Sequence, residues 1–126
     1  HVAYPALDPS GLPASLSAKI LRGVARQELG FDGLIVTDAI EMQGLTRYRT
    51  EQDAALEAFA AGADLLMGPT DPRKIRDGLA TALTSTDAEH DAETKVLRSR
   101  LLESYARIMS VKHRFGILAP GKSMRK

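Results

Sequence analysis

Residues 33–42 have the sequence GLIVTDAIEM, and this stretch decides the predicted fold. Small and apolar residues run from Gly33 up to Thr37, which is typical of a strand buried on both faces in a parallel α/β sheet. Asp38 follows at once. Because the chemistry of such sheets takes place beyond the carboxyl ends of the strands, Asp38 is the first candidate functional residue. The alternative is that Asp38 begins a turn or caps the next segment.

Helical patterns lie on both sides of this strand. Before it, either Ser15 or Ser17 can cap a helix that is expected to end at Gly30. After it, Thr50 is expected to cap an Ala-rich helix that Gly62 ends. The predicted apolar face of the first helix consists of Ile20, Leu21, Val24 and Ala25.

The same alternation continues into the second half of the chain. Asp64–Gly68 predicts another strand, because Pro69 lacks an amide hydrogen and closes the run. Asp71 is the predicted N-cap of a helix that has Pro72 at its first position and reaches about Thr84. Alternating strands and helices indicate an α/β fold with parallel strands.

A polar loop over residues 85–93 is expected to lead into a last helix from about Glu93 to His113. The predicted apolar stripe of this helix consists of Leu97, Leu101, Tyr105 and Ile108. Gly116 is expected to end the helix, and Ile117 and Leu118 to fold back onto the core. Residues 119–126 predict a flexible C-terminal tail.

The composition of the chain restricts its class. The 126 residues are 44% hydrophobic, which is enough for one domain with a core, and contain no cysteine for a disulfide framework or a thiolate metal site. A net charge of +1 indicates no nucleic-acid partner, and no apolar run is long enough for a membrane span. No cofactor is predicted, and the compartment is left open. The chain begins at His1 within patterned sequence, so we expect a piece of a longer protein.

Four segments together resemble the last third of the catalytic barrel of glycoside hydrolase family 3, and within it the β-N-acetylhexosaminidase branch most. They are HVAYPALDPSGLPASLS, LRGVARQELGFDGLIVTDAIEM, AFAAGADLLMGP and RLLESYARIMSVKHRFGIL. The resemblance covers residues 1–118 and implies the C-terminal part of a (β/α)₈ TIM barrel. It implies that His1–Tyr4 belongs to strand six, Gly33–Thr37 is strand seven and Asp64–Gly68 is strand eight, with residues 93–113 as the closing helix.

The resemblance also implies a chemistry. A retaining glycosidase needs a carboxylate that attacks the anomeric carbon and a second group that protonates the leaving oxygen. Asp38 matches the nucleophile of the family, and Thr37 and the loop amides after it are suited to hold it. The family's acid/base and its other sugar-binding residues lie upstream and have no match here. We therefore expect an inactive fragment of an enzyme that cleaves terminal β-linked N-acetylhexosamine from an oligosaccharide or cell-wall fragment, with the remaining barrel in the same or another chain.

Four residues lie near Asp38 in the sequence or on a neighbouring predicted strand, and each has a possible role. Met42 either contacts the sugar or packs in the core as a flexible apolar residue. His1 is either a substrate-binding residue or a polar group satisfied by the protein. Glu41 is interpreted as structural or solvated. Asp64 precedes its strand at the end away from the chemistry and is interpreted as a cap or turn residue.

Three other functions were considered. A β-glucosidase or β-xylosidase of the same family tends to have Trp after the nucleophile, where this chain has Ala39. A phosphoacceptor domain needs an acidic pair for Mg²⁺ and a Lys after a late strand, and Met67-Gly68-Pro69 supplies no Lys. A non-catalytic assembly fragment is the third.

Overall fold

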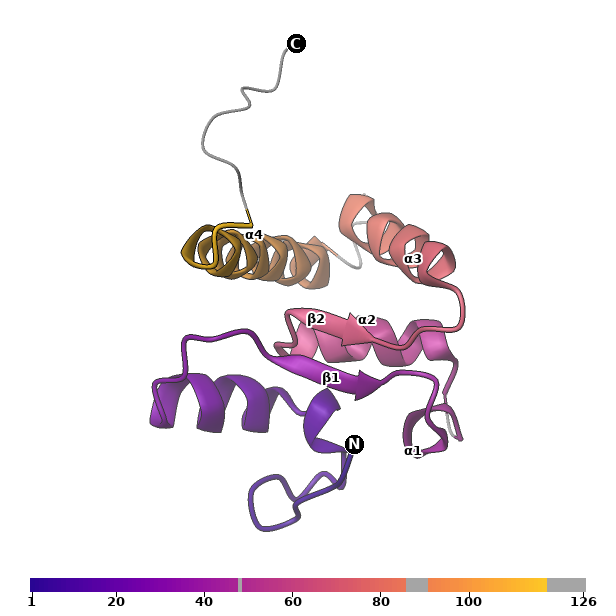
Figure 1. The fold of residues 1–126 in the computed structure, drawn as a ribbon. Coiled ribbons are helices and arrows are strands. Elements are labelled where there is room, and N and C mark those ends of the chain that lie inside the picture. The colour runs from indigo at the N-terminus through magenta and orange to yellow at the C-terminus, as the bar shows by residue number, and fades with distance from the viewer. Residues whose placement is uncertain (48, 86–90, 118–126) are drawn as a thin grey trace.

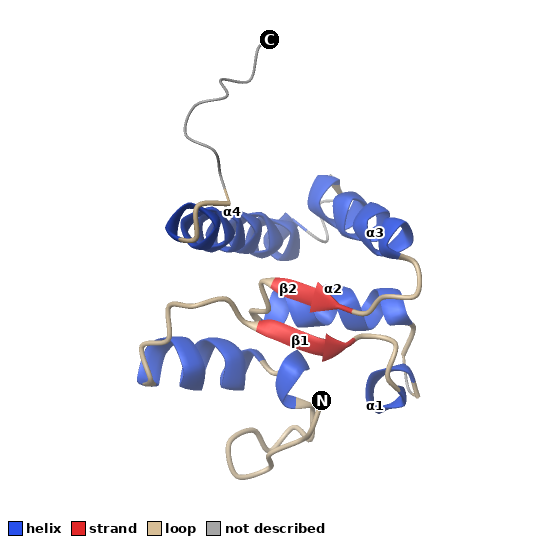
Figure 2. Cartoon of the chain, viewed as in Figure 1, coloured by secondary structure: helices blue, strands red, loops and turns tan. Residues whose placement is uncertain are grey.

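The structure is a computed structural model that describes residues 1–47, 49–85 and 91–117. Its elements, in chain order, are η1 (Ala14–Leu16), η2 (Lys19–Glu28), β1 (Val36–Ala39), α1 (Gln43–Thr46), α2 (Glu51–Ala61), β2 (Leu65–Met67), α3 (Pro72–Thr84) and α4 (Asp91–Arg114). Figures 1 and 2 show α2 behind the two strands, α3 and α4 along one side of them, and η2 on the opposite side. The predicted α/β class is confirmed.

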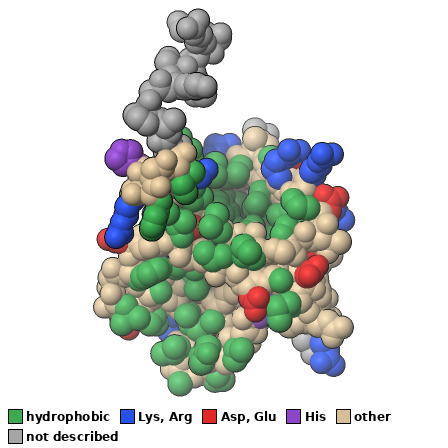
Figure 3. Space-filling view, viewed as in Figure 1, with side chains coloured by type: hydrophobic (Ala, Val, Ile, Leu, Met, Phe, Trp, Pro, Cys, Tyr) green, Lys and Arg blue, Asp and Glu red, His purple; other side chains and the backbone are tan. Residues whose placement is uncertain are grey.

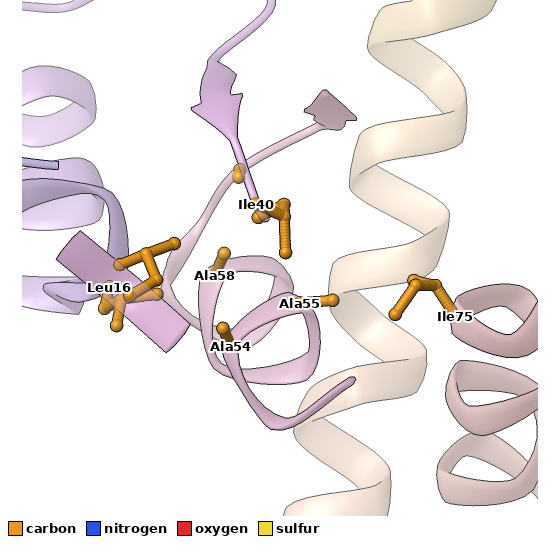
Figure 4. Packing of buried hydrophobic residues seen from close by; sticks show 8 residues of the cluster. Leu16, Ile40, Ala54, Ala55, Ala58 and Ile75 are labelled. Carbon is orange, nitrogen blue, oxygen red and sulfur yellow. The ribbon is translucent and has the colours of Figure 1, made fainter. Parts of the chain in front are cut away.

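Helix α2 lies at the centre of the packing. It contacts η1, η2, α1, β2, α3 and α4, and its small side chains allow these elements to approach closely (Figure 4). The predicted bounds of this helix are confirmed. Thr50 caps it by accepting a hydrogen bond from Asp53 N–H at 3.1 Å, and Gly62 ends it at φ 131°. The core cluster consists of Leu16, Ile40, Leu45, Ala54, Ala55, Ala58, Ala63 and Ile75.

The two strands are parallel, as predicted, but β1 begins and ends later than the sequence indicates. Pairing starts at Ile35, whose carbonyl accepts hydrogen bonds from Asp64 N–H at 2.7 Å and Leu65 N–H at 3.1 Å. The residues before it form a bend, because the Arg26 guanidinium binds the carbonyls of Phe31 and Gly33, each at 2.6 Å. The strand is therefore Val36–Ala39 rather than 33–37, and Asp38 lies inside its last part rather than beyond it.

The register between the strands is irregular at the same place. Val36 pairs with Leu65 and Ala39 pairs with Met67, so three steps along β1 match two steps along β2. One extra residue on one strand is a β-bulge, a distortion that redirects the side chains next to it. The bulge spans the two residues between these pairs, Thr37 and Asp38.

The predicted strand at His1–Tyr4 is wrong. This segment makes only an isolated antiparallel bridge, between Ala3 and Pro13, and Ala14 N–H donates to the Val2 carbonyl at 2.8 Å. The chain turns immediately afterwards, because the Tyr4 carbonyl accepts hydrogen bonds from Leu7 N–H and Asp8 N–H, both at 2.9 Å. Without a neighbouring strand along its length, an extended segment gains no ladder of hydrogen bonds.

Helix η2 also differs from the expected amphipathic α-helix. It is a π-helix, and it closes with a hydrogen bond from Leu29 N–H to the Val24 carbonyl at 3.0 Å. Ser17, rather than Ser15, caps it, because the Ser17 hydroxyl accepts from Ile20 N–H at 3.1 Å. None of its residues is fully buried, so the predicted apolar face is only half covered.

Helices α3 and α4 form the remaining layer. Asp71 caps α3 by accepting from Arg73 N–H and Lys74 N–H at 3.0 and 3.1 Å, as predicted. Helix α4 begins two residues earlier than predicted, at Asp91. No helix within the described ranges is long and apolar enough to cross a membrane.

The buried face of α4 is not the predicted apolar stripe. Of that stripe only Leu97 is buried, while Leu101 is 45% exposed and Tyr105 is 61% exposed. The residues of α4 that are buried are Thr94, Leu97, Arg100 and Ser104. Ile117 does not fold back either, since it is 67% exposed. Residues 86–90 of the predicted loop, Leu118 and the predicted tail 119–126 lie outside the described residues.

Candidate active site

Asp38 lies at the carboxyl end of β1, at the end of the sheet where both parallel strands stop. Its side chain is exposed, and its Oδ1 accepts a hydrogen bond from the neighbouring Ala39 N–H at 2.8 Å. The Ala39 N–H is thus in direct contact with the Asp38 carboxylate. An exposed carboxylate at this end of a parallel strand is placed to meet a ligand.

Thr37 joins β1 to β2 at the bulge. Its side chain is buried, and its Oγ1 accepts a hydrogen bond from Met67 N–H at 3.0 Å. A side-chain hydroxyl therefore contributes to strand pairing where the backbone register shifts. This bond fixes the residue immediately before Asp38, whereas Thr37 was expected to hold the Asp38 carboxylate itself.

Gly68 brings the end of β2 close to the same point. Its φ is +55°, and a Cβ built there would lie 2.8 Å from the Ala39 Cβ, which is closer than two carbon atoms can approach. A residue without a side chain is therefore required beside Ala39. The predicted strand Asp64–Gly68 is one residue too long at each end, since β2 comprises Leu65–Met67.

His1 reaches the same residue from the start of the chain. Its Nε2 lies 3.0 Å from the Ala39 carbonyl oxygen, and its Nδ1 lies 2.6 Å from Ser15 Oγ. Both ring nitrogens therefore contact protein atoms, which favours the interpretation of His1 as a satisfied polar group. A sugar contact through either nitrogen, which stays a prediction, would have to replace one of these bonds.

Met42 and Glu41 follow Asp38 in the loop that enters α1. Met42 is 43% exposed, so the structure does not place it in the core. Its predicted contact with a sugar stays a prediction. Glu41 is exposed, and its Oε2 accepts a long hydrogen bond from the Thr70 hydroxyl at 3.5 Å, which agrees with a solvated side chain.

Asp64 forms a separate, buried cluster at the opposite end of the strands. Its Oδ2 contacts Arg26 at 2.6 Å and Ile35 N–H at 3.0 Å, and its Oδ1 accepts from the Ser104 hydroxyl at 2.8 Å. Arg100 and Arg107 each lie 3.4 Å from Oδ1. The interpretation of Asp64 as a cap or turn residue is therefore wrong.

The surroundings of Asp64 explain its charge state. Burial acts to raise the pKa of the carboxyl group, but the Ile35 N–H, the Ser104 hydroxyl and the positive charges of Arg26 and Arg107 outweigh it. The pKa of Asp64 is consequently held below its ordinary value. The spacing of Arg100, Ser104 and Arg107 on one helix face is the signal from which this contact could have been predicted.

A metal centre does not emerge from these side chains. Within residues 1–47, 49–85 and 91–117, no three His, Asp or Glu side chains gather where they could hold an ion. In the part of the chain that the structure describes, the candidate site is the Asp38 carboxylate at the end of β1, together with its neighbours Thr37, Ala39, Gly68 and His1.

Comparison with known protein families identifies the family of the chain. Residues 1–110 match the glycosyl hydrolase family 3 N-terminal domain. The chain belongs to this family.

The relatives within the family are named as β-hexosaminidases. The chain is 33% identical over 123 residues to β-hexosaminidase A of Pseudoalteromonas piscicida, which covers 89% of the chain and 21% of the relative. It is 40% identical over 83 residues to a β-hexosaminidase of Nitrosomonas eutropha, covering 66% of the chain and 23% of the relative. The chain thus spans about a fifth to a quarter of the length of these relatives.

Comparison with solved structures agrees with the family assignment. The fold superposes with a TM-score of 0.72 and 30% identity on a glycoside hydrolase family 3 β-N-acetylglucosaminidase from Paenibacillus sp. str. FPU-7, over 97% of this chain and 24% of that one. It superposes with a TM-score of 0.71 and 27% identity on CbsA from Thermotoga neapolitana, over 90% of this chain and 24% of that one. The chain is therefore similar to family 3 β-hexosaminidases, and these comparisons lend no support to the phosphoacceptor alternative.

Proposed function

We propose that this chain is part of a retaining β-N-acetylhexosaminidase and that Asp38 is its nucleophile. The observation that carries the proposal is the exposed Asp38 carboxylate at the carboxyl end of a parallel strand, in a chain of family 3. The names of the relatives support the sugar class. The presence of Ala39, where the glucosidases and xylosidases that this family also contains tend to have Trp, supports it as well.

The proposed reaction has two steps. An Asp38 oxygen attacks the anomeric carbon, the bond to the leaving oxygen breaks, and an acid outside this chain gives that oxygen its proton. The same group then takes a proton from water, whose oxygen displaces Asp38 and releases the sugar with its original configuration. In a retaining enzyme the two groups stand about 5–5.5 Å apart, so the acid must come from a segment that packs over the open end of β1.

We further propose that residues 1–118 form the C-terminal part of a (β/α)₈ barrel. The sheet face away from α2 is open and apolar: Val36, Leu65 and Met67 are 48%, 37% and 51% exposed, and hydrophobic side chains gather on this face in Figure 3. A two-stranded sheet also leaves both edges unpaired.

The edge of β2 supports the same proposal. Beside it lies a groove of about 450 Å³ that β2, α3 and α4 enclose, with Leu66, Leu79 and Leu83 among its apolar lining residues. A further strand and helix of the same or another chain would cover this groove and the open sheet face. Such a barrel needs about 250 residues, roughly twice the length of this chain.

Replacement of Asp38 in the full-length enzyme tests the proposed function. Asp38→Asn keeps the size of the side chain but removes the nucleophile, so turnover of 4-nitrophenyl N-acetyl-β-glucosaminide should fall roughly 10³-fold or more. Glu41→Gln, an equivalent change three residues further on, should leave turnover within a few-fold of the wild type. Equal losses in both variants, or full activity in Asp38→Asn, would contradict the assignment.

We expect the chain by itself to be inactive, because the segments by which it resembles family 3 do not include the one that carries the family's proton donor. The purified 126-residue chain, assayed at micromolar concentration with the same substrate, should release nitrophenol at the uncatalysed rate. Turnover above this rate that disappears in Asp38→Asn would show that the acid lies within these residues.

A further inference from the structure

One side chain connects three segments around the candidate nucleophile. The imidazole of His1 contacts Ser15 in η1 through Nδ1, at 2.6 Å, and the carbonyl oxygen of Ala39 at the end of β1 through Nε2, at 3.0 Å. A Cβ on Gly44 would lie 3.7 Å from the His1 Cβ, so α1 packs against the same residue. We propose that His1 is a positioning residue, which holds the Ala39 peptide and thereby the direction of the Asp38 carboxylate. This inference rests on the proposed function.

The contacts of Ala39 carry the argument. Its N–H donates to Asp38 Oδ1 at 2.8 Å, and its carbonyl accepts from the His1 ring. The N–H and the carbonyl of Ala39 thus link the Asp38 carboxylate to the His1 imidazole. Ile40, the next residue, is fully buried and donates its N–H to the Met67 carbonyl at 2.9 Å, so the backbone beyond Ala39 is fixed as well.

The bulge explains why such a contact is needed. In a regular ladder the hydrogen bonds alone set the direction of each side chain, but the register between β1 and β2 shifts between Val36 and Ala39. The side chain of Thr37, the residue before Asp38, accepts from Met67 N–H on β2, and the side chain of His1 binds the carbonyl of Ala39, the residue after Asp38. The direction of the nucleophile therefore depends on these side chains.

Ser15 sets the orientation of the ring. A carbonyl oxygen can only accept, so the hydrogen lies on Nε2, and in the neutral imidazole Nδ1 then accepts from the Ser15 hydroxyl. Ser15 is buried within η1. Removal of this hydroxyl should let the ring turn and weaken its hold on Ala39.

A matched pair of variants in the full-length enzyme tests the inference. The amide nitrogen of Gln is as many bonds from the backbone as Nε2, so His1→Gln keeps a donor for Ala39. The amide nitrogen of Asn corresponds to Nδ1, so His1→Asn loses that donor. With 4-nitrophenyl N-acetyl-β-glucosaminide, His1→Asn should lower kcat about 10–100-fold with KM within about threefold, because a shift of about 1 Å in the reacting geometry costs up to about 10²-fold. His1→Gln should recover most of kcat, and Ser15→Ala should lie between them.

Three outcomes would overturn it. The first is an unchanged kcat in His1→Asn. The second is a raised KM at unchanged kcat, which would make His1 a sugar-binding residue. The third is an equal decrease of kcat in His1→Gln and His1→Asn that is fully explained by a smaller fraction of folded protein, as measured by thermal unfolding. The wild type and Asp38→Asn are measured in the same assay as controls. If the proposed function is wrong, the wild type will be inactive or Asp38→Asn will be active, and neither result depends on His1.

Discussion

Asp38 and Asp64 lie at opposite ends of the same short sheet, in contrasting surroundings. Asp38 is exposed and accepts a hydrogen bond from the amide of the next residue. The Asp64 carboxylate is buried and contacts Arg26, the Ile35 amide and the Ser104 hydroxyl. A carboxylate that is to react must be reachable by a ligand, whereas one that holds elements together must be enclosed and satisfied. These surroundings fit the reactive role that we propose for Asp38 and a structural role for Asp64.

The depressed pKa of Asp64 makes stability depend on pH in the acid range. Its folded pKa lies below the unfolded value of about 3.9, so the stabilisation is fully present above that value and is lost as the pH falls through the folded pKa. Arg107→Gln removes one of the nearby charges, so the Asp64 pKa should rise and acid unfolding should begin at higher pH. Carboxyl-carbon NMR titration of the chain measures the first effect, and unfolding at a series of pH values measures the second.

Asp8 provides an internal control in the same titration. Its pKa is also lowered, chiefly by the Ser17 hydroxyl, and Arg107 does not contribute to this shift. Arg107→Gln should therefore leave the Asp8 titration unchanged. An Asp64 pKa that does not move, or that moves together with that of Asp8, would contradict the account of the cluster.

Thr37 supplies a second prediction at the level of one residue. Thr37→Val keeps the shape of the side chain but removes the acceptor for Met67 N–H, so the free energy of unfolding should fall by about 1–2 kcal/mol. Thr37→Ser keeps the hydroxyl and should lose less. Urea unfolding of the chain compares the two, and a Ser variant less stable than the Val variant would argue against this role for the hydroxyl.

At the scale of elements, α4 is attached to the sheet by polar contacts. Ser104 is buried and donates to the charged Asp64, so Ser104→Ala should cost about 1.5–3 kcal/mol of unfolding free energy. Ser99 is exposed on the same helix, and Ser99→Ala should be neutral or slightly stabilising because Ala favours helix. Denaturation of both variants provides the comparison, and equal effects would show that Asp64 does not anchor α4.

Local chemistry in the sequence predicts most of the elements. Thr50 with Gly62, and Asp71 with Pro72, mark the bounds of α2 and α3 because caps and breakers act on residues a few positions away. The start of β1 could not be predicted in this way, because it depends on Arg26 binding the carbonyls that precede the strand.

The same limit applies to the candidate site. The position of Asp38 after a strand run made it a candidate but left a turn or cap role open, and only the resemblance to family 3 implied a nucleophile. The contact between His1 and Ala39 joins residues 38 positions apart, and the bulge depends on the pairing of β1 with β2, so no local pattern encodes either feature. The face of α4 was misjudged for a related reason: its buried positions include Arg100 and Ser104, which a search for apolar residues passes over.

At the scale of the whole molecule, the open sheet face is the feature that a complete barrel would enclose. Met67 is 51% exposed on this face, so Met67→Lys should be tolerated in the isolated chain. In the full-length enzyme the same charge would be buried in the barrel interior and should cost about 2–4 kcal/mol. Leu102→Lys, at a site 71% exposed on α4, should change the stability of either form by no more than about 0.5 kcal/mol.

Thermal unfolding of Met67→Lys and Leu102→Lys, each in the isolated chain and in the full-length enzyme, measures this difference in stability. A full-length enzyme that tolerates Met67→Lys as well as Leu102→Lys would show that the face of β2 remains open, which would contradict the barrel.

The most direct test of the central claim is to identify the residue that becomes glycosylated. The full-length enzyme is treated with a fluorinated N-acetylglucosaminyl fluoride that forms the glycosyl-enzyme faster than water can remove it, then digested and analysed by mass spectrometry. We predict a single sugar adduct on the peptide that contains Asp38, absent from Asp38→Asn. An adduct on a different carboxylate, such as Glu41, or an active enzyme that inverts its product without an adduct, would contradict the account.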